Sequence, residues 1–100
     1  MSDLSVNIRR KRRAVIVSVA GEIDMATAGR LESSVRGHAD LDVTVDLEGV
    51  TFMDSSGITA LVRLQRQVMD EGHTLRVTGE RPNVRRVLEI SGLYDLLHGG

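Results

Sequence analysis

Four consecutive residues, Asp54-Ser55-Ser56-Gly57, have the clearest potential for chemistry in this sequence. They follow an apolar stretch and precede a run with helical spacing, so we expect them where a buried strand meets a helix. Asp and Ser commonly start helices, because their side-chain oxygens accept hydrogen bonds from free backbone N–H groups. Gly57 is less expected, since glycine in the first helical turn costs about 1 kcal/mol relative to alanine. Its missing side chain would let another backbone or a phosphate approach, so a helix start and a binding site are both open.

Catalysis by Ser55 would require a base within hydrogen-bonding distance. The histidines of the chain are His38, His73 and His98. The first two are expected beyond the C-termini of helices, and a helix of some 15 residues spans about 22 Å. They would therefore lie at the opposite edge of the domain, and His98 lies near the chain end. We expect the protein not to be an enzyme.

Asp54 is also a poor candidate for the phosphoacceptor of a two-component receiver. That chemistry uses an acidic pair with a divalent metal and a lysine at the end of a later strand. Lys11 is the only lysine and belongs to the N-terminal region, while the later strand ends at Thr78. Glycine-rich nucleotide motifs and cysteines are also absent from the sequence. We therefore predict no cofactor and no metal.

Length and composition indicate one domain over residues 1–100. The chain is 41% hydrophobic and 27% charged, which is typical of a globular protein. Its N-terminus is too polar for a signal peptide, and no apolar run reaches the roughly 18 residues of a membrane span. We expect a cytoplasmic protein without direct membrane insertion.

The net charge of −1 gives no overall attraction for nucleic acid, and none is predicted as a partner. A local exception is the basic cluster Arg9-Arg10-Lys11-Arg12-Arg13. It is interpreted as a solvated hairpin turn or as a contact for an acidic partner. RNA is the weaker alternative, because no aromatic residue lies nearby to stack on bases.

The hydrophobic periodicity places these features in a single α/β domain. Strands are predicted at 4–10, 14–20, 41–47 and 74–78. Helices are predicted from a cap at Asp24 or Thr27 to Gly37, from Asp54 to Gly72, and from a start at Pro82 or a cap at Asn83 to Gly92. The order is β-β-α-β-α-β-α, and strands separated by single helices require parallel pairing with crossovers. We expect a mixed, mainly parallel four-stranded sheet with helices mainly on one face. A second polar junction, Gly21-Glu22-Ile23-Asp24, would open on the same sheet edge as Asp54 if the two strands are neighbours.

Three segments together resemble the STAS domain of bacterial anti-sigma factor antagonists. They are Phe52-Met53-Asp54-Ser55-Ser56-Gly57-Ile58, the upstream Gly21-Glu22-Ile23-Asp24, and the late segment from Val84 through Ser91-Gly92-Leu93. They occur in the family's order over nearly the whole chain, and the Asp-Ser-Ser-Gly element is the most specific. Family members commonly continue with another strand and a terminal helix, which are expected to be missing or truncated here.

The resemblance implies a regulatory cycle. The unphosphorylated antagonist binds an anti-sigma factor, often a GHKL-type serine kinase, and thereby frees a sigma factor. The kinase phosphorylates a serine in the turn, and a serine phosphatase resets it. The residue directly after the aspartate is Ser55, which is carried over as the phosphorylation site; Ser56 is the less favoured position.

The resemblance also implies a partner-binding surface at this edge. Its predicted residues are Asp24, Met25, Thr27, Asp54, Ser56, Gly57 and Ile58. For Met25 and Ile58, a core-facing position is an equally good interpretation of the pattern. Alternatives within the same family are a constitutive STAS scaffold subunit of a lipid-transport ABC transporter complex and a weak nucleotide-binding STAS domain.

Overall fold

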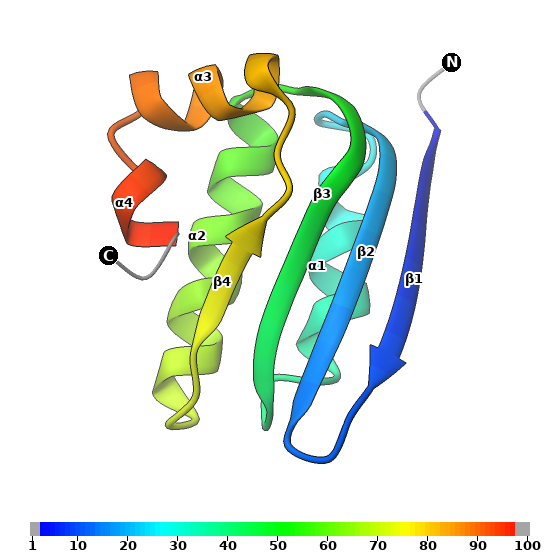
Figure 1. Cartoon of the computed structure of the whole chain (residues 1–100), viewed down its shortest axis with the longest axis vertical. Helices are drawn as coiled ribbons and strands as arrows, with labels where there is room; N and C mark the ends of the chain where they lie inside the picture. The colour runs from blue at the N-terminus through cyan, green and yellow to red at the C-terminus, as the bar shows by residue number, and fades with distance from the viewer. Residues whose placement is uncertain (1–2, 98–100) are drawn as a thin grey trace.

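Four strands form one mixed sheet in the order β1-β2-β3-β4 in the computed structural model, which describes residues 3–97 (Figure 1). Strand β1 (Leu4–Arg10) pairs antiparallel with β2 (Ala14–Ile23). Strand β3 (Asp42–Met53) then pairs parallel with both β2 and β4 (Leu75–Thr78). The predicted mixed, mainly parallel four-stranded sheet is confirmed.

The helices are α1 (Ala28–Arg36), α2 (Ser55–Asp70), α3 (Pro82–Ile90) and a short α4 (Tyr94–Leu97). Figure 1 shows α1 and α2 side by side against one face of the sheet, with α3 at the end where α2 begins and α4 beside α2. The predicted element order is confirmed, and α4 is added after it. In the described part of the chain, no helix is long and apolar enough to cross a membrane.

The core lies between the sheet and helices α1 and α2 and is almost entirely aliphatic. Alternate residues of β2 and β3 point toward the helices because successive side chains of a strand face opposite sides. Helical spacing of three and four residues supplies the other half of the core. Its fully buried members include Val15, Val17, Val43, Val45, Leu31, Val35, Leu61 and Val68.

Two strands run further than predicted. Strand β2 continues past Ala20 to Ile23, and β3 continues past Leu47 to Met53. The pairing shifts register between Ser18 and Ala20 and again after Gly21, which breaks the alternation on which the prediction relied. Gly21 has φ +107°, and a Cβ there would lie 2.1 Å from the carbonyl oxygen of Asp3, so the glycine permits a bulge and does not end the strand. The longer strands carry both polar junctions to the same edge of the sheet.

Candidate functional site

The two polar junctions lie side by side. Glu22 pairs with Phe52 and Ile23 with Met53 in the last steps of the parallel β2–β3 ladder. Just beyond, the backbone N–H of Asp54 donates to the carbonyl of Ile23 at 3.1 Å. The expectation that both turns open on one sheet edge is therefore confirmed.

Asp54 caps the N-terminus of α2. Its backbone is extended, and its Oδ1 accepts a hydrogen bond from the N–H of Ser56 at 2.8 Å. This bond satisfies one of the backbone donors that a helix start leaves free. The helix-start interpretation of the aspartate is confirmed.

Ser55 is the first residue of α2, and its side chain is exposed. Its backbone carbonyl accepts from the Thr59 hydroxyl at 3.0 Å, which fixes the first turn. Its own hydroxyl makes no hydrogen bond to any of residues 3–97. The next residue, Ser56, is partly buried. Of the two serines, Ser55 is thus the more accessible to a modifying enzyme.

Gly57 is buried, and its close neighbours belong to the sheet. A Cβ on this residue would lie 2.5 Å from Cγ of Met53 and 2.8 Å from Cγ2 of Ile23. These atoms belong to the ends of β2 and β3 beneath the helix. The glycine therefore lets α2 approach the sheet closely, while its predicted contact with a partner stays a prediction.

The loop between β2 and α1 is held by a compact set of hydrogen bonds. Oδ1 of Asp24 accepts from the N–H groups of Ala26 at 2.9 Å and Thr27 at 3.1 Å. The Thr27 hydroxyl donates to the carbonyl of Glu22 at 2.8 Å and accepts from the N–H of Asp24 at 2.9 Å. Thr27 is only 3% exposed and positions the loop, while its predicted contact with a partner stays a prediction.

The apolar residues of the site divide into exposed and buried ones. Ile58 is 8% exposed and belongs to the core, which settles its predicted ambiguity in favour of packing. Met25 is 85% exposed. Phe52, which the sequence interpretation did not assign to the surface, is 45% exposed. Its position could not be deduced by counting alternate residues, because the β2–β3 irregularities change which side each residue faces. Met25 and Phe52 thus present apolar surface at the edge where α2 begins.

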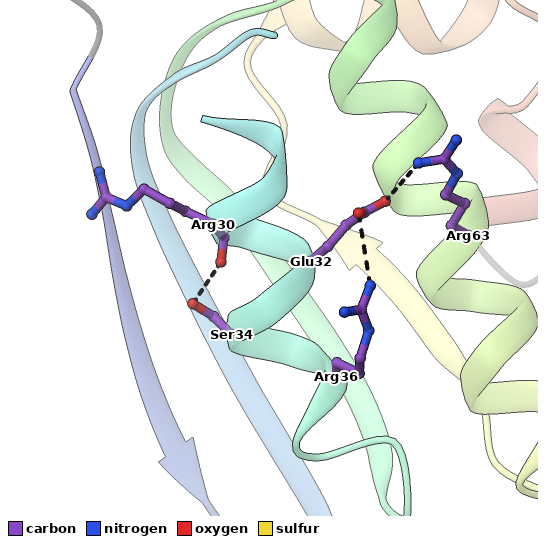
Figure 2. Close-up of polar contacts among 5 residues, drawn as sticks. All are labelled: Arg30, Glu32, Ser34, Arg36 and Arg63. Carbon is purple, nitrogen blue, oxygen red and sulfur yellow. Dashed lines mark hydrogen bonds and ion pairs between the residues drawn. The ribbon is translucent and has the colours of Figure 1, made fainter. Parts of the chain in front are cut away.

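A groove of about 310 Å³ leads from this edge between α1 and α2. Its lining includes small residues and one charged pair, and consists of Met25, Ala28, Gly29, Glu32, Ser56, Thr59, Ala60 and Arg63. Figure 2 shows Glu32 pointing between the helices toward Arg63 and Arg36. Its Oε1 lies 3.7 Å from Nη1 of Arg63, and its Oε2 lies 3.9 Å from Nη2 of Arg36. On the opposite side of α1, Arg30 donates to the carbonyl of Leu4 at 2.8 Å. These contacts link α1 to β1 on one side and to α2 on the other.

The start of α3 is attached to the same end of the sheet. Asn83 donates from Nδ2 to the carbonyl of Thr51 at 2.8 Å, and Arg81 donates from Nε to the carbonyl of Glu48 at 2.9 Å. Pro82 occupies the first helical turn, as its fixed φ favours and as predicted. Both side-chain bonds attach the start of α3 to backbone carbonyls of the last part of β3, the strand that leads into the turn at Asp54.

No histidine of the described chain lies near Ser55. His38 and His73 follow the C-terminal ends of α1 and α2, and α2 alone spans 16 residues, about 24 Å. Nδ1 of His73 lies 3.2 Å from Oδ1 of Asp42, which also accepts from the N–H of Thr74. The hydrogen bond from the Thr74 N–H has the larger effect and the contact with His73 the smaller one, and both lower the pKa of Asp42. The third histidine, His98, lies outside the described residues. Among residues 3–97, no group of three or more His, Asp or Glu side chains could hold a metal ion.

Comparisons with known proteins agree with this geometry. An anti-sigma-B factor antagonist of Staphylococcus aureus is 30% identical over 99 residues, which cover 96% of this chain and 92% of that protein. The structure of an anti-sigma factor antagonist from Mycobacterium paratuberculosis superposes with a TM-score of 0.84 at 27% identity, over 96% of this chain and 83% of that one.

The anti-sigma factor antagonist SpoIIAA in its unphosphorylated form has the same fold, with a TM-score of 0.80 at 21% identity over 90% of this chain and 83% of that one. The Bacillus protein SpoIIAA has also been solved in its phosphorylated form, with a TM-score of 0.71 at 19% identity over 94% of this chain and 88% of that one. The STAS domain family matches residues 5–99. With nearly its whole length matched, and with both polar junctions at one sheet edge, the chain belongs to the STAS domain family.

Proposed function

We propose that this protein is a cytoplasmic, non-enzymatic anti-sigma factor antagonist that phosphorylation of Ser55 switches off. In its unphosphorylated form it binds an anti-sigma factor, a GHKL-type serine kinase, and so frees a sigma factor. The observation that carries the proposal is the exposed Ser55 hydroxyl at the start of α2, which makes no hydrogen bond within the described residues. Relatives named as anti-sigma factor antagonists support the same function.

The surface for the anti-sigma factor is the edge around this hydroxyl. Met25 and Phe52 supply apolar area, and Asp24 and Asp54 supply charge beside them. Exposed Met and Phe are residue types that interfaces favour. Ser56 lines the neighbouring groove between α1 and α2, which can receive a small apolar side chain of the partner.

A phosphate on Ser55 is compatible with the fold. The N-terminus of a helix carries free N–H groups and the positive end of the helix dipole, which stabilise a nearby anion by about 0.3–1 kcal/mol. The serine side chain is exposed, so added bulk displaces no core residue. Phosphorylation therefore leaves the domain folded and acts on the partner.

The same phosphate weakens the interface by charge and by size. It adds about −1.5 to −2 charges next to Asp54 and close to Asp24. A partner carboxylate roughly 5 Å from the phosphate would be repelled by about 1–3 kcal/mol per pair of unit charges, at effective dielectric constants between 80 and 20. Each 1.4 kcal/mol corresponds to about tenfold in affinity. A partner that brings its own carboxylate or apolar surface to this edge is displaced, and removal of the phosphate by a serine phosphatase restores binding.

The decisive experiment combines the protein with its cognate anti-sigma kinase and ATP, followed by intact mass spectrometry and peptide mapping. A single phosphate on Ser55 is expected, lost in Ser55→Ala and kept in Ser56→Ala, the matched control. Ser55→Asp should lower affinity for the anti-sigma factor at least tenfold, for the charge reason given above. The proposal would be contradicted if the Ser55→Ala variant were phosphorylated as well as the Ser56→Ala variant. It would also be contradicted if the kinase left the wild-type protein unmodified.

A further inference from the structure

A second surface lies at the other end of the molecule. The turn between β1 and β2 and the last residues of β1 form a cluster of five basic side chains, Arg9, Arg10, Lys11, Arg12 and Arg13, here named the basic tip. All five are exposed, and none forms an ion pair with a carboxylate of residues 3–97. Figure 1 shows this turn projecting at the end of the sheet opposite the start of α2. Along β2, nine residue steps of about 3.3 Å place the tip roughly 30 Å from the Ser55 edge.

The tip does not have the residue types that two-residue hairpin turns usually contain. Lys11 donates its N–H to the carbonyl of Ala14 at 2.7 Å, which leaves Arg12 and Arg13 as the two residues at the turn. Two-residue hairpin turns favour Asn-Gly or Asp-Gly, whose backbones adopt positive φ easily. No non-glycine residue of the described chain has positive φ, so the two arginines turn the chain without that geometry. Turn formation therefore does not account for an Arg-Arg pair flanked by three further cations.

The tip also differs in charge from the rest of the protein. It holds five of the 13 Lys and Arg residues, so eight remain against 14 Asp and Glu, a formal net charge of −6. Arginine forks bind carboxylate groups in pairs of parallel hydrogen bonds, and four of the five cations are arginines. Like charges packed together repel each other unless a counter-charge covers them. The tip is thus complementary to a group of carboxylates.

The surroundings of the tip favour a narrow partner over a flat one. Four exposed carboxylates, from Asp40, Asp42, Asp70 and Glu71, lie in segments at the same end of the molecule, which Figure 1 shows as the start of β3 and the end of α2. A membrane pressed against this end would meet those carboxylates together with the tip. An extended acidic peptide can contact the projecting turn alone. RNA lacks the aromatic platform that single strands require, since Phe52 and Tyr94, the chain's two aromatic residues, lie outside the tip.

We infer that the basic tip is a second docking site, which binds a carboxylate-rich segment of a protein partner independently of Ser55. Binding depends on ionic strength, because exposed ion pairs are screened within about 10 Å at 0.1 M salt. The two sites are far enough apart for both to be occupied at once.

Capped hexaglutamate is the probe, with binding measured by fluorescence anisotropy and mapped by amide chemical shifts on the full chain. The double variant Arg12→Asn/Arg13→Gly removes two charges and introduces residues that two-residue hairpin turns accept, so it should remain folded. The matched control Arg66→Gln/Arg86→Gln removes two exposed charges from α2 and α3. Loss of two exposed ion pairs predicts roughly a 2- to 30-fold weaker affinity in the tip variant and an unchanged affinity in the control.

The inference would be overturned if both variants lost peptide affinity equally, or if the peptide-induced chemical-shift changes spread beyond the tip. Tighter tip-dependent binding to phosphatidylserine vesicles or to oligouridine than to the peptide would overturn it as well. Ser55 phosphorylation by the kinase should proceed equally in both variants. This readout separates the failure of the tip inference from the failure of the phosphorylation switch.

Discussion

The N–H of Asp54 donates to the carbonyl of Ile23, and this hydrogen bond joins the start of α2 to the end of β2. It extends the β2–β3 pairing by one step past the last paired residues. The turn that carries Ser55 and the loop that carries Met25 therefore have a common backbone support.

Two substitutions of Asp54 should distinguish the helix-capping role of its side chain from the effect of its charge. Asp54→Ala removes the acceptor for the Ser56 N–H and should lower the free energy of unfolding by about 0.5–2 kcal/mol. Asp54→Asn retains an acceptor oxygen and should change stability by only a few tenths of a kcal/mol. Urea denaturation at neutral pH measures both. Equal destabilisation by the two substitutions would show that the side-chain cap is not what stabilises the turn.

Gly57→Ala should destabilise the protein by about 1–3 kcal/mol, because its Cβ would overlap Met53 and Ile23. The control is Gly29→Ala in α1, where a Cβ has no atom within 4 Å. That change should stabilise the helix by as much as about 1 kcal/mol. Adding Met53→Ala to Gly57→Ala should recover part of the loss through coupling in a double-mutant cycle. A stabilising Gly57→Ala would contradict the close helix–sheet approach.

Met25→Ala should leave the stability of the free protein within about 0.5 kcal/mol, since the side chain is 85% exposed. Affinity of the unphosphorylated protein for its anti-sigma factor should fall by 1 kcal/mol or more, about fivefold or greater. Isothermal titration calorimetry measures the affinity. Met69→Ala, at a methionine that is 57% exposed near the far end of α2, is the matched control and should bind normally. Identical affinities for the two variants would remove Met25 from the interface.

Asp42 should contribute to stability in a pH-dependent way. Its pKa is lowered by the Thr74 N–H and by His73, so the carboxylate form is favoured in the folded state. The contribution is therefore fully present above the unfolded pKa, near 3.9, and is lost as pH falls through the lower folded value. Asp42→Asn should be less stable than wild type at neutral pH, and the difference should vanish in strong acid.

Chemical denaturation across that pH range tests the Asp42 prediction. Asp40→Asn, which removes a neighbouring exposed carboxylate without that hydrogen bond, is the control. A stability difference between Asp42→Asn and wild type that is the same at every pH would contradict the role of the ionised carboxylate.

Sequence patterns predicted the element types and order well, because long aliphatic runs with clear periods determine which faces are buried. They failed at the ends of β2 and β3, where Gly21 and Gly49 allow irregular pairing that looks like a strand end. The same irregularity concealed the exposure of Phe52.

For the site, the sequence predicted that the two polar junctions lie together but not which of their residues are buried. Thr27, Gly57 and Ile58, which were predicted to contact a partner, are buried in the structure. A motif specifies which residues occur together, and burial decides which of them a partner can reach. Gly57 shows this most clearly, because one of its close neighbours, Ile23, belongs to a strand far from it in the sequence.

The hydrogen bonds that hold Asp24, Thr27 and Asp54 also have a kinetic consequence. A surface that is already ordered loses little conformational entropy when a partner docks, so encounter requires no rearrangement of this protein. Phosphate would be read mainly as a shorter residence time of the complex, set by its dissociation rate.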